Sequence, residues 1–212
     1  MKIIDLTHYI SPDMPVYPGT EPPVFEPANT YEKDHFKETR ISMFTHTGTH
    51  MDPPAHIIKG GKTLDEFDVS QFVGKAVVIE CSELTAGQKI TMEHINKCRD
   101  MADKAEFLLF NTGWDRYWGQ DEYFGDFPCI DDEVAEYIIS TEKKGVGLDT
   151  ISLDPIASLR QHNKVLEKNS IVIIENLEKL ELVKGGMFTF CALPLKHTDA
   201  DGSPIRAIAI ID

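Results

Sequence analysis

The segment HTGTHMDPPAH, residues 46–56, holds three of the eight histidines in a chain of 212 residues, together with one aspartate. Imidazole nitrogens and carboxylate oxygens suit zinc, manganese or iron, and such ions need three or four converging ligands. His46 and His50 are four residues apart, which on a helix would place them on one face. Gly48 lies between them and two prolines follow, which makes a helix unfavourable. We therefore expect an extended, sharply turning segment that holds a metal ion.

The composition is that of an ordinary soluble globular protein. Hydrophobic residues make up 42% of the chain and charged residues 26%, and the length suits a single domain, residues 1–212, with a substantial core. Lysine and arginine number 21 against 35 aspartates and glutamates, which gives a formal net charge of -14. Because binding to a phosphate backbone would work against this charge, we expect no nucleic-acid partner.

The N-terminus and the cysteines bear on the cellular location. Residues 1–5 lack the apolar run of a signal peptide, and no stretch approaches the ~20 apolar residues of a membrane span. Cys81, Cys98, Cys129 and Cys191 are scattered without a C-x-x-C pair, as expected of reduced structural thiols, and Cys191 is expected to be buried. We predict a cytoplasmic protein with no membrane partner and no nucleophilic cysteine.

Strands and helices are expected to alternate after the histidine segment, which predicts an α/β domain. The expected strands are residues 75–81, 105–112, 146–149, 170–175, 188–193 and 205–211, and the expected helices are residues 91–103, capped by Thr91, and 131–144. Before the segment, frequent prolines exclude long helices. Short extended segments and turns are expected there, forming an arm that could wrap a neighbour or cover a site.

The pattern H-x-G-T-H-x-D-x-P-x-H in residues 46–56 resembles the signature of the cyclase-like metal-dependent hydrolases. This family includes bacterial kynurenine formamidase and isatin hydrolase. Three further regions resemble family blocks in family order: residues 4–8 with 14–19, residues 147–155, and residues 192–196 with 203–207. The resemblance spans nearly the whole chain. It implies the swivelling β/β/α fold, with a mixed sheet and flanking helices.

Two more candidate ligands come from the later blocks. Glu175 closes an apolar run, so it is expected to be at least partly buried, and a buried charge must be paired or bind a metal. From the sequence alone, His162 could be a surface histidine. The family resemblance implies instead that it is a metal ligand. The arrangement that the resemblance implies is His46, His50 and Asp52 on one ion and Asp52, His162 and Glu175 on a second. Zinc is the first expectation for one or two divalent ions, with manganese or iron(II) as alternatives.

His56 is the candidate catalytic acid and base. Its ordinary pKa of ~6.5 suits proton transfer in both directions, and the leaving amine of an amide needs a proton. The alternatives for His56 are a further metal ligand or a structural loop residue. Water activated by the ions would attack the carbonyl of an amide, formamide or lactam.

The residues that face the substrate are less specific. Trp114, Tyr117 and Trp118 could stack on an aromatic substrate or pack a dimer interface. For Tyr17, Phe25 and Phe44, core packing is favoured over a role in apolar pocket walls. His8 is expected to be structural or to support a ligand, and His35 and His94 are expected to be solvated.

Three functions remain open from the sequence. The first is a metal-dependent hydrolase that cleaves a C–N bond of a small, aromatic amide, most like arylformamidase, or else a lactam such as isatin. The second is a polyketide-type cyclase or dehydratase, and the third is a metal-binding protein without catalysis. The proline-rich arm and the habit of the family predict a homodimer or homotetramer.

Overall fold

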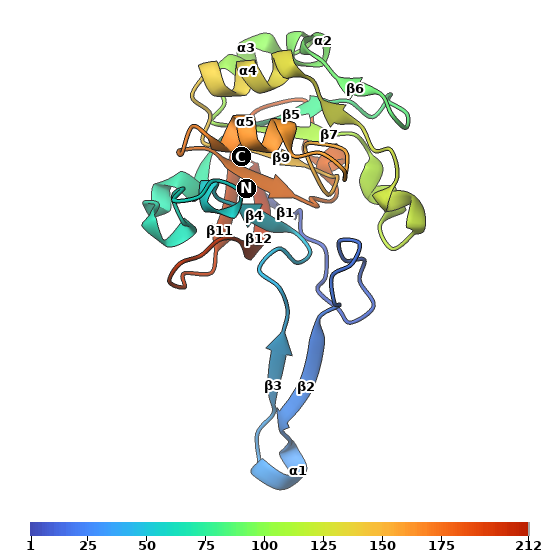
Figure 1. Ribbon diagram of the computed structural model, residues 1–212, viewed down its shortest axis with the longest axis vertical. Helices are drawn as coiled ribbons and strands as arrows, with labels where there is room; N and C mark the ends of the chain where they lie inside the picture. Colours follow the sequence, from blue (N-terminus) through green and yellow to red (C-terminus); the bar gives the residue numbers. More distant parts are fainter. Residues whose placement is uncertain (212) are drawn as a thin grey trace.

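The computed structural model describes residues 1–211, and its centre is one eight-stranded sheet (Figure 1). In spatial order the strands are β1 (Lys2–Asp5), β12 (Ser203–Ile211), β11 (Phe188–Pro194), β5 (Val73–Glu80), β7 (Phe107–Asn111), β9 (Gly145–Leu148), β10 (Val172–Glu175) and β4 (His50–Asp52). Because β4 also pairs with β12, all strands except β1 form a closed, barrel-like sheet. The strands from β5 to β10 run parallel and the other pairs are antiparallel. The predicted α/β fold with a mixed sheet is confirmed.

Two apolar cores lie on the two faces of this sheet. In β5, Val77 and Ile79 belong to one core, and Ala76 and Val78 belong to the other, as the alternation of side chains along a strand requires. The first core includes the buried side chains of the helices. The second joins residues from strands on opposite sides of the closed sheet. Both faces of the parallel strands are therefore covered, which explains why their sequences are apolar runs without alternation.

Four helices pack on the sheet or on one another. They are α2 (Met92–Asn96), α3 (Arg99–Lys104), α4 (Asp132–Ser140) and α5 (Arg160–Leu166). The first three lie together at one end of the molecule, and α5 lies against β10 (Figure 1). The remaining short elements are the paired strands β6 (Lys89–Ile90) and β8 (Cys129–Ile130) and the 3-10 turns Pro54–His56, Leu64–Glu66, Val69–Phe72, Trp114–Tyr117, Asp121–Phe124 and Leu180–Leu182.

The boundaries of both predicted helices differ from the structure. The single helix expected over residues 91–103 is two short helices, because Asn96 and Cys98 are weak helix formers and the Cys98 N–H bonds to the Ile95 carbonyl in a tighter 3-10 turn. The helix expected to reach residue 144 ends at Ser140. There, the Thr141 hydroxyl donates to the Tyr137 carbonyl at 2.6 Å, and the next residue has a positive φ.

The burial predictions for His94 and Cys191 are wrong. His94 is buried, not solvated, because its Nδ1 accepts the backbone N–H of Thr91 at 3.0 Å and so closes the start of α2. Thr91 does cap this helix, as predicted. Cys191 is only partly buried, because it lies on a less covered face of β11. All four cysteines are free.

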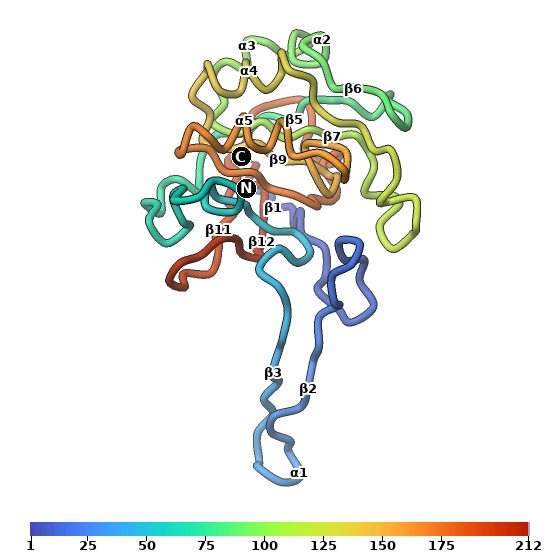
Figure 2. Tube along the Cα trace, in the orientation of Figure 1, coloured from blue at the N-terminus to red at the C-terminus, as the bar shows by residue number. Residues whose placement is uncertain are grey.

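The N-terminal region forms an arm, but only one of the six prolines before residue 46, Pro27, lies in it. We define the arm as residues 24–42, which comprise β2 (Val24–Asn29), the one-turn helix α1 (Tyr31–Asp34) and β3 (Glu38–Ser42). It projects away from the rest of the molecule, which we call the body (Figures 1 and 2). Every residue of β3 is exposed, and α1 buries none of its residues. Within residues 1–211, no helix is long and apolar enough to span a membrane.

Candidate metal centre and active site

The histidine segment enters the sheet as a short buried strand. The backbone turns at Gly48, whose φ is +65°, and β4 follows with its three residues, from His50 to Asp52, all buried. The Nδ1–H of His50 donates to the carbonyl of Gly48 at 2.8 Å, so Nε2 points away from the turn. A second glycine, Gly202, lets the backbone pass close to the ring of His46. A Cβ at this position would lie 2.4 Å from that ring. The predicted extended, sharply turning geometry is confirmed.

Strand register brings Glu175 to this segment. In the antiparallel pair of β4 and β10, Glu175 lies directly opposite His50, so the two side chains share one face of the sheet. Their closest atoms, His50 Nε2 and Glu175 Oε2, are 3.4 Å apart. Glu175 is 6% exposed. Burial and the nearby charge of Asp52 raise the pKa of Glu175, although His162 and His50 oppose this shift.

Asp52 lies at the centre of a cluster of polar side chains, which we call the cluster. Its members are His46, His50, Asp52, His162 and Glu175. Oδ1 of Asp52 is 2.8 Å from His46 Nδ1 and 3.2 Å from His50 Nε2, and its Oδ2 is 3.7 Å from His162 Nε2. Burial alone would raise the pKa of Asp52, but the charge of His50 and the hydrogen bonds from the three histidines hold it well below its usual value. The pKa of His50 moves the other way: burial would lower it, but Asp52 and Glu175 raise it to about 9.

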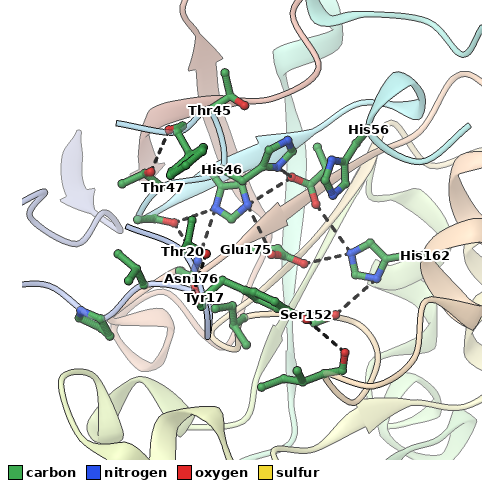
Figure 3. A pocket seen from close by; sticks show the side chains of 18 of the residues that line it. Tyr17, Thr20, Thr45, His46, Thr47, His56, Ser152, His162, Glu175 and Asn176 are labelled. Atoms are coloured by element: carbon green, nitrogen blue, oxygen red, sulfur yellow. Dashed lines mark hydrogen bonds and ion pairs between the residues drawn. The ribbon is translucent and has the colours of Figure 1, made fainter. Parts of the chain in front are cut away.

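His162 reaches the cluster from α5. Its Nε2 lies 3.0 Å from Glu175 Oε1 (Figure 3). Burial would lower the pKa of His162, but Asp154, Asp52 and Glu175 raise it well above its usual value. The structure thus places His162 beside the residues of β4 and β10, although more than 100 residues separate it from His50 in the sequence.

The cluster fits a divalent cation. Two groups of side chains have ligand atoms close enough to share an ion: His46, Asp52 and His56, and His50, Asp52 and Glu175. Asp52 belongs to both groups. Two buried carboxylates side by side repel each other unless a positive charge lies between them. In the part of the chain that the structure describes, Nε2 of His46 is also buried without a hydrogen-bond partner.

His56 lies above the buried ligands, at the end of the 3-10 turn Pro54–His56. Its ring packs against that of His46, with the ring centres 3.8 Å apart (Figure 3). The side chain is exposed at the pocket, yet the surrounding protein atoms desolvate it enough to lower its pKa to about 4, with Asp52 opposing. His56 is therefore neutral near pH 7 and able to accept a proton.

The cluster forms the floor of a cavity of about 400 Å³, a size that suits a small organic molecule. Apolar side chains form much of its wall: Val16, Tyr17, Phe44, Trp118, Ile151, Ile156 and Leu159. Tyr17 is 45% exposed and Phe44 51%, so the expectation that these two pack in the core is wrong. Both precede β4 in the chain, and their side chains line the cavity.

The two tryptophans that follow β7, Trp114 and Trp118, have different roles. Trp114 is 5% exposed and packs against Tyr123 and Ile151, so it is part of a small core and not an exposed platform. Its indole N–H donates to the Tyr123 carbonyl at 3.1 Å. Trp118 lines the cavity, and its ring stacks on the buried ring of His8 with centres 3.9 Å apart. His8 thus supports a pocket wall.

One residue that supports the cluster, Asn176, is hard to recognise from the sequence. Asn176 follows β10 with a φ of +59°, and its Nδ2 donates to the Gly48 carbonyl at 2.8 Å. The Tyr123 hydroxyl donates to Asn176 Oδ1 at 2.6 Å. These bonds hold the same carbonyl that orients His50. An asparagine next to a buried strand-end glutamate is the only hint, and it is a weak one.

The sequence profile of the family described as "Putative cyclase" matches residues 4–155. The chain belongs to this family. Kynurenine formamidase from Bacillus cereus (strain ATCC 10987 / NRS 248) is 30% identical over 208 residues, covering 97% of this chain and 95% of that protein. Its counterpart from Geobacillus thermodenitrificans (strain NG80-2) is 31% identical over 207 residues, covering 96% of this chain and 95% of that protein.

Two solved structures share the fold of this chain. Isatin hydrolase A from Labrenzia aggregata, bound to benzyl benzoate, superposes with a TM-score of 0.86 at 25% identity, covering 99% of this chain and 93% of that one. A potential metal-dependent hydrolase with cyclase activity superposes with a TM-score of 0.79 at 27% identity. The match covers 98% of this chain and 96% of that one. This cyclase-family protein is therefore a hydrolytic, metal-dependent enzyme, which confirms the family and the enzyme class expected from residues 46–56.

Proposed function

We propose that this enzyme hydrolyses the C–N bond of a small aromatic amide, with an aryl formamide such as N-formylkynurenine as the first candidate. The observation that supports this most is the position of the His, Asp and Glu cluster at the floor of a largely apolar cavity, with His56 beside it. The full-length similarity to kynurenine formamidases supports the formamide.

The proposed ligands are the five buried or partly buried side chains of the cluster. We assign His46, His50 and Asp52 to one divalent ion and Asp52, His162 and Glu175 to a second. Zinc is the first choice and manganese the alternative, because imidazole and carboxylate ligands accept both. When bound, such ions supply an activated water and polarise a carbonyl oxygen. The donor set and the orphaned Nε2 of His46 support this assignment.

His56 is the proposed proton carrier. It is neutral near pH 7, so it can accept the proton that the attacking water loses. It can then deliver that proton to the leaving nitrogen, which would otherwise depart as an unstable amide anion. Its position at the end of a short turn, against the ring of His46, places the proton near the reacting atoms.

The apolar wall supports an aromatic substrate. Tyr17 and Trp118 offer ring surfaces, and the Tyr17 hydroxyl donates to the carbonyl of Ile156 at 3.2 Å across the cavity. A flat aryl group between such surfaces would be held by stacking and by apolar burial. This interaction would orient the amide toward the cluster and exclude bulk water from it.

The direct test is hydrolysis of formanilide and N-formylkynurenine by the chelator-treated protein before and after zinc or manganese is restored. We expect formate release only with the metal. A lactam such as isatin, which the likeness to isatin hydrolase A supports, would open its ring without releasing formate. Absence of hydrolysis of all three compounds with either metal would refute the proposal.

A cyclase or dehydratase reaction is distinguished by labelled water. Hydrolysis incorporates one solvent oxygen into the product, whereas dehydration consumes none. Mass spectrometry of the product formed in ¹⁸O-water therefore separates the two reaction classes. Product without the label would favour the cyclase alternative that the family name suggests.

We further propose a homodimer or homotetramer held by the arm. An isolated two-stranded hairpin is marginal in water, yet the arm exposes Tyr31, Phe36 and Ile41 by half or more of their surfaces. A second copy of the chain is the partner expected to cover them. Replacing residues 24–42 by a short glycine-serine link should yield monomers in light scattering; an unchanged mass would refute the arm as the contact.

Three broader assignments complete the proposal. Residues 1–212 are taken as one domain with the swivelling β/β/α fold of the cyclase-like hydrolases. The four free cysteines support a reducing, cytoplasmic environment. Limited proteolysis tests the domain assignment, since a single domain should show cleavage within the arm before any cleavage within the body.

A further inference from the structure

His162 faces carboxylates on both edges of its ring. On one edge, Nε2 lies 3.0 Å from Glu175 Oε1 and 3.7 Å from Asp52 Oδ2. On the other edge, Nδ1 lies 3.4 Å from Ser152 Oγ (Figure 3). The same nitrogen lies 3.5 Å from Asp154 Oδ2. A ring nitrogen binds an ion only without its proton, so a His162 that holds an ion through Nε2 must keep its remaining proton on Nδ1.

Asp154 is held beside Nδ1 of His162 at 3.5 Å, and Ser152 Oγ is the hydrogen-bond partner of the same nitrogen. Oδ2 of Asp154 accepts the backbone N–H groups of Gln161 at 2.7 Å and of His162 at 3.0 Å, at the start of α5. Its own backbone N–H donates to Ser152 Oγ at 3.1 Å. The carboxylate is only 4% exposed, so it has little freedom to turn away.

The other buried histidine of the cluster is held differently. The Nδ1–H of His50 donates to the neutral carbonyl of Gly48. Both rings therefore have a defined acceptor behind them, but only the ring of His162 has a charged one. A carboxylate behind an imidazole fixes its tautomer and raises the basicity of the opposite nitrogen, and loss of such a partner typically weakens metal binding ~10- to 100-fold.

We propose that Asp154 is a positioning residue for the metal centre, which holds His162 as the Nδ1–H tautomer and strengthens the ion bound through Nε2. This rests on the proposed function in one respect, the assignment of His162 as a ligand. Asp154 also caps α5, so its effect on the metal must be separated from its effect on the fold.

The chain offers a matched control in Asp131. This residue caps α4, where its side chain accepts the Val134 N–H at 2.9 Å, and it does not line the pocket. Asp154→Asn and Asp131→Asn remove the same charge from two helix caps. We expect ~10- to 100-fold weaker zinc binding, measured by competition with a chromogenic chelator, for Asp154→Asn alone. Thermal unfolding of the two metal-free variants should show similar, modest losses.

A second variant guards against a folding defect. Asp154→Ser keeps an oxygen that can cap α5 but removes the carboxylate, so it should weaken zinc binding to a similar extent. Histidine ¹⁵N NMR of the zinc-loaded wild type should show His162 protonated at Nδ1, with faster exchange of that proton in both variants. Unchanged zinc affinity in folded Asp154→Asn and Asp154→Ser, with active wild type, overturns this inference alone. A wild type that binds no divalent ion overturns the proposed function as well.

Discussion

At the floor of the pocket, Asp52 and Glu175 are almost fully buried and lie within 3.7 Å of histidine nitrogens. In the arm, Glu26 also faces a cation, but its side chain is 60% exposed and lies 3.9 Å from Arg40. Water screens the second pair, so it contributes little to stability. At the pocket floor burial weakens this screening, and the carboxylates need a compensating positive charge. Burial, more than residue type, therefore separates a candidate metal centre from a solvated surface.

Removal of the central carboxylate should give the largest effect. Asp52→Ala should lose most of the bound metal and with it nearly all hydrolysis, because Asp52 belongs to both groups of candidate ligands. Elemental analysis of the purified variant measures this. The matched change in the arm, Glu26→Ala, should leave the metal content unaltered. Full metal occupancy in Asp52→Ala would contradict the assignment of Asp52 as a ligand.

Replacement of the proposed proton carrier should spare the metal. His56→Ala is expected to retain near-normal metal content and to lose a factor on the order of 10² to 10⁴ in turnover. The loss should be larger for an anilide than for an activated phenol ester, whose leaving group needs little protonation. Steady-state kinetics on both substrates provide the measurement. Equal losses would argue against leaving-group protonation, and loss of the metal would identify His56 as a ligand.

Truncating an apolar side chain to alanine should reduce the unfolding free energy much more in the body than in the arm. Leu108 in β7 is fully buried, and Leu108→Ala should cost about 2–5 kcal/mol of unfolding free energy. Ile41 in β3 is 51% exposed, and Ile41→Ala should cost less than about 0.5 kcal/mol within one chain. Urea unfolding at several protein concentrations tests both. If Ile41 lies at a contact between copies, its effect will shrink on dilution as the copies dissociate; a large effect independent of concentration would contradict the description of the arm.

The smallest expected effect is a pH dependence due to His8. Burial lowers the pKa of His8 to about 4 in the folded chain, against an ordinary value of 6.5. Between these values the unfolded chain binds a proton that the folded chain does not, so stability falls as the pH decreases from 6.5 toward 4. His8→Phe keeps a ring that can stack on Trp118 and should remove this part of the loss. Melting curves from pH 7 to 5 test it; identical slopes for both proteins would exclude His8 as a source.

The difference between body and arm also marks what the sequence could predict. Apolar runs located six strands, and in four of them, β5, β7, β9 and β10, burial on both faces leaves few alternatives for the residues. Residues 46–56, with His162 and Glu175 supplied by the family resemblance, named side chains that the structure brings to one cavity. Their roles as ligands stay predictions. Strand register, which places Glu175 opposite His50, comes from long-range pairing that local patterns do not contain.

The errors have physical causes too. His94 was expected to be solvated because its neighbours are charged, but its ring turns back to close the start of α2. Trp114 was expected to stack on a substrate or pack a dimer interface, but it fills a small core with Tyr123. Asp154 and Asn176 each make side-chain hydrogen bonds to residues of other segments, and such bonds leave no periodic pattern. Local sequence predicts which residues can be buried better than it predicts where each polar atom finds its partner.

The central claim, that ions bind at the side chains around Asp52, is tested most directly by X-ray diffraction from crystals grown with zinc. We expect anomalous scattering at the zinc edge to give one or two peaks, each within about 2.0–2.2 Å of an Asp52 oxygen or of a histidine nitrogen of the cluster. The same crystals of Asp52→Ala should lose the signal. Zinc bound away from this cluster in an enzyme that still hydrolyses formanilide would contradict the account.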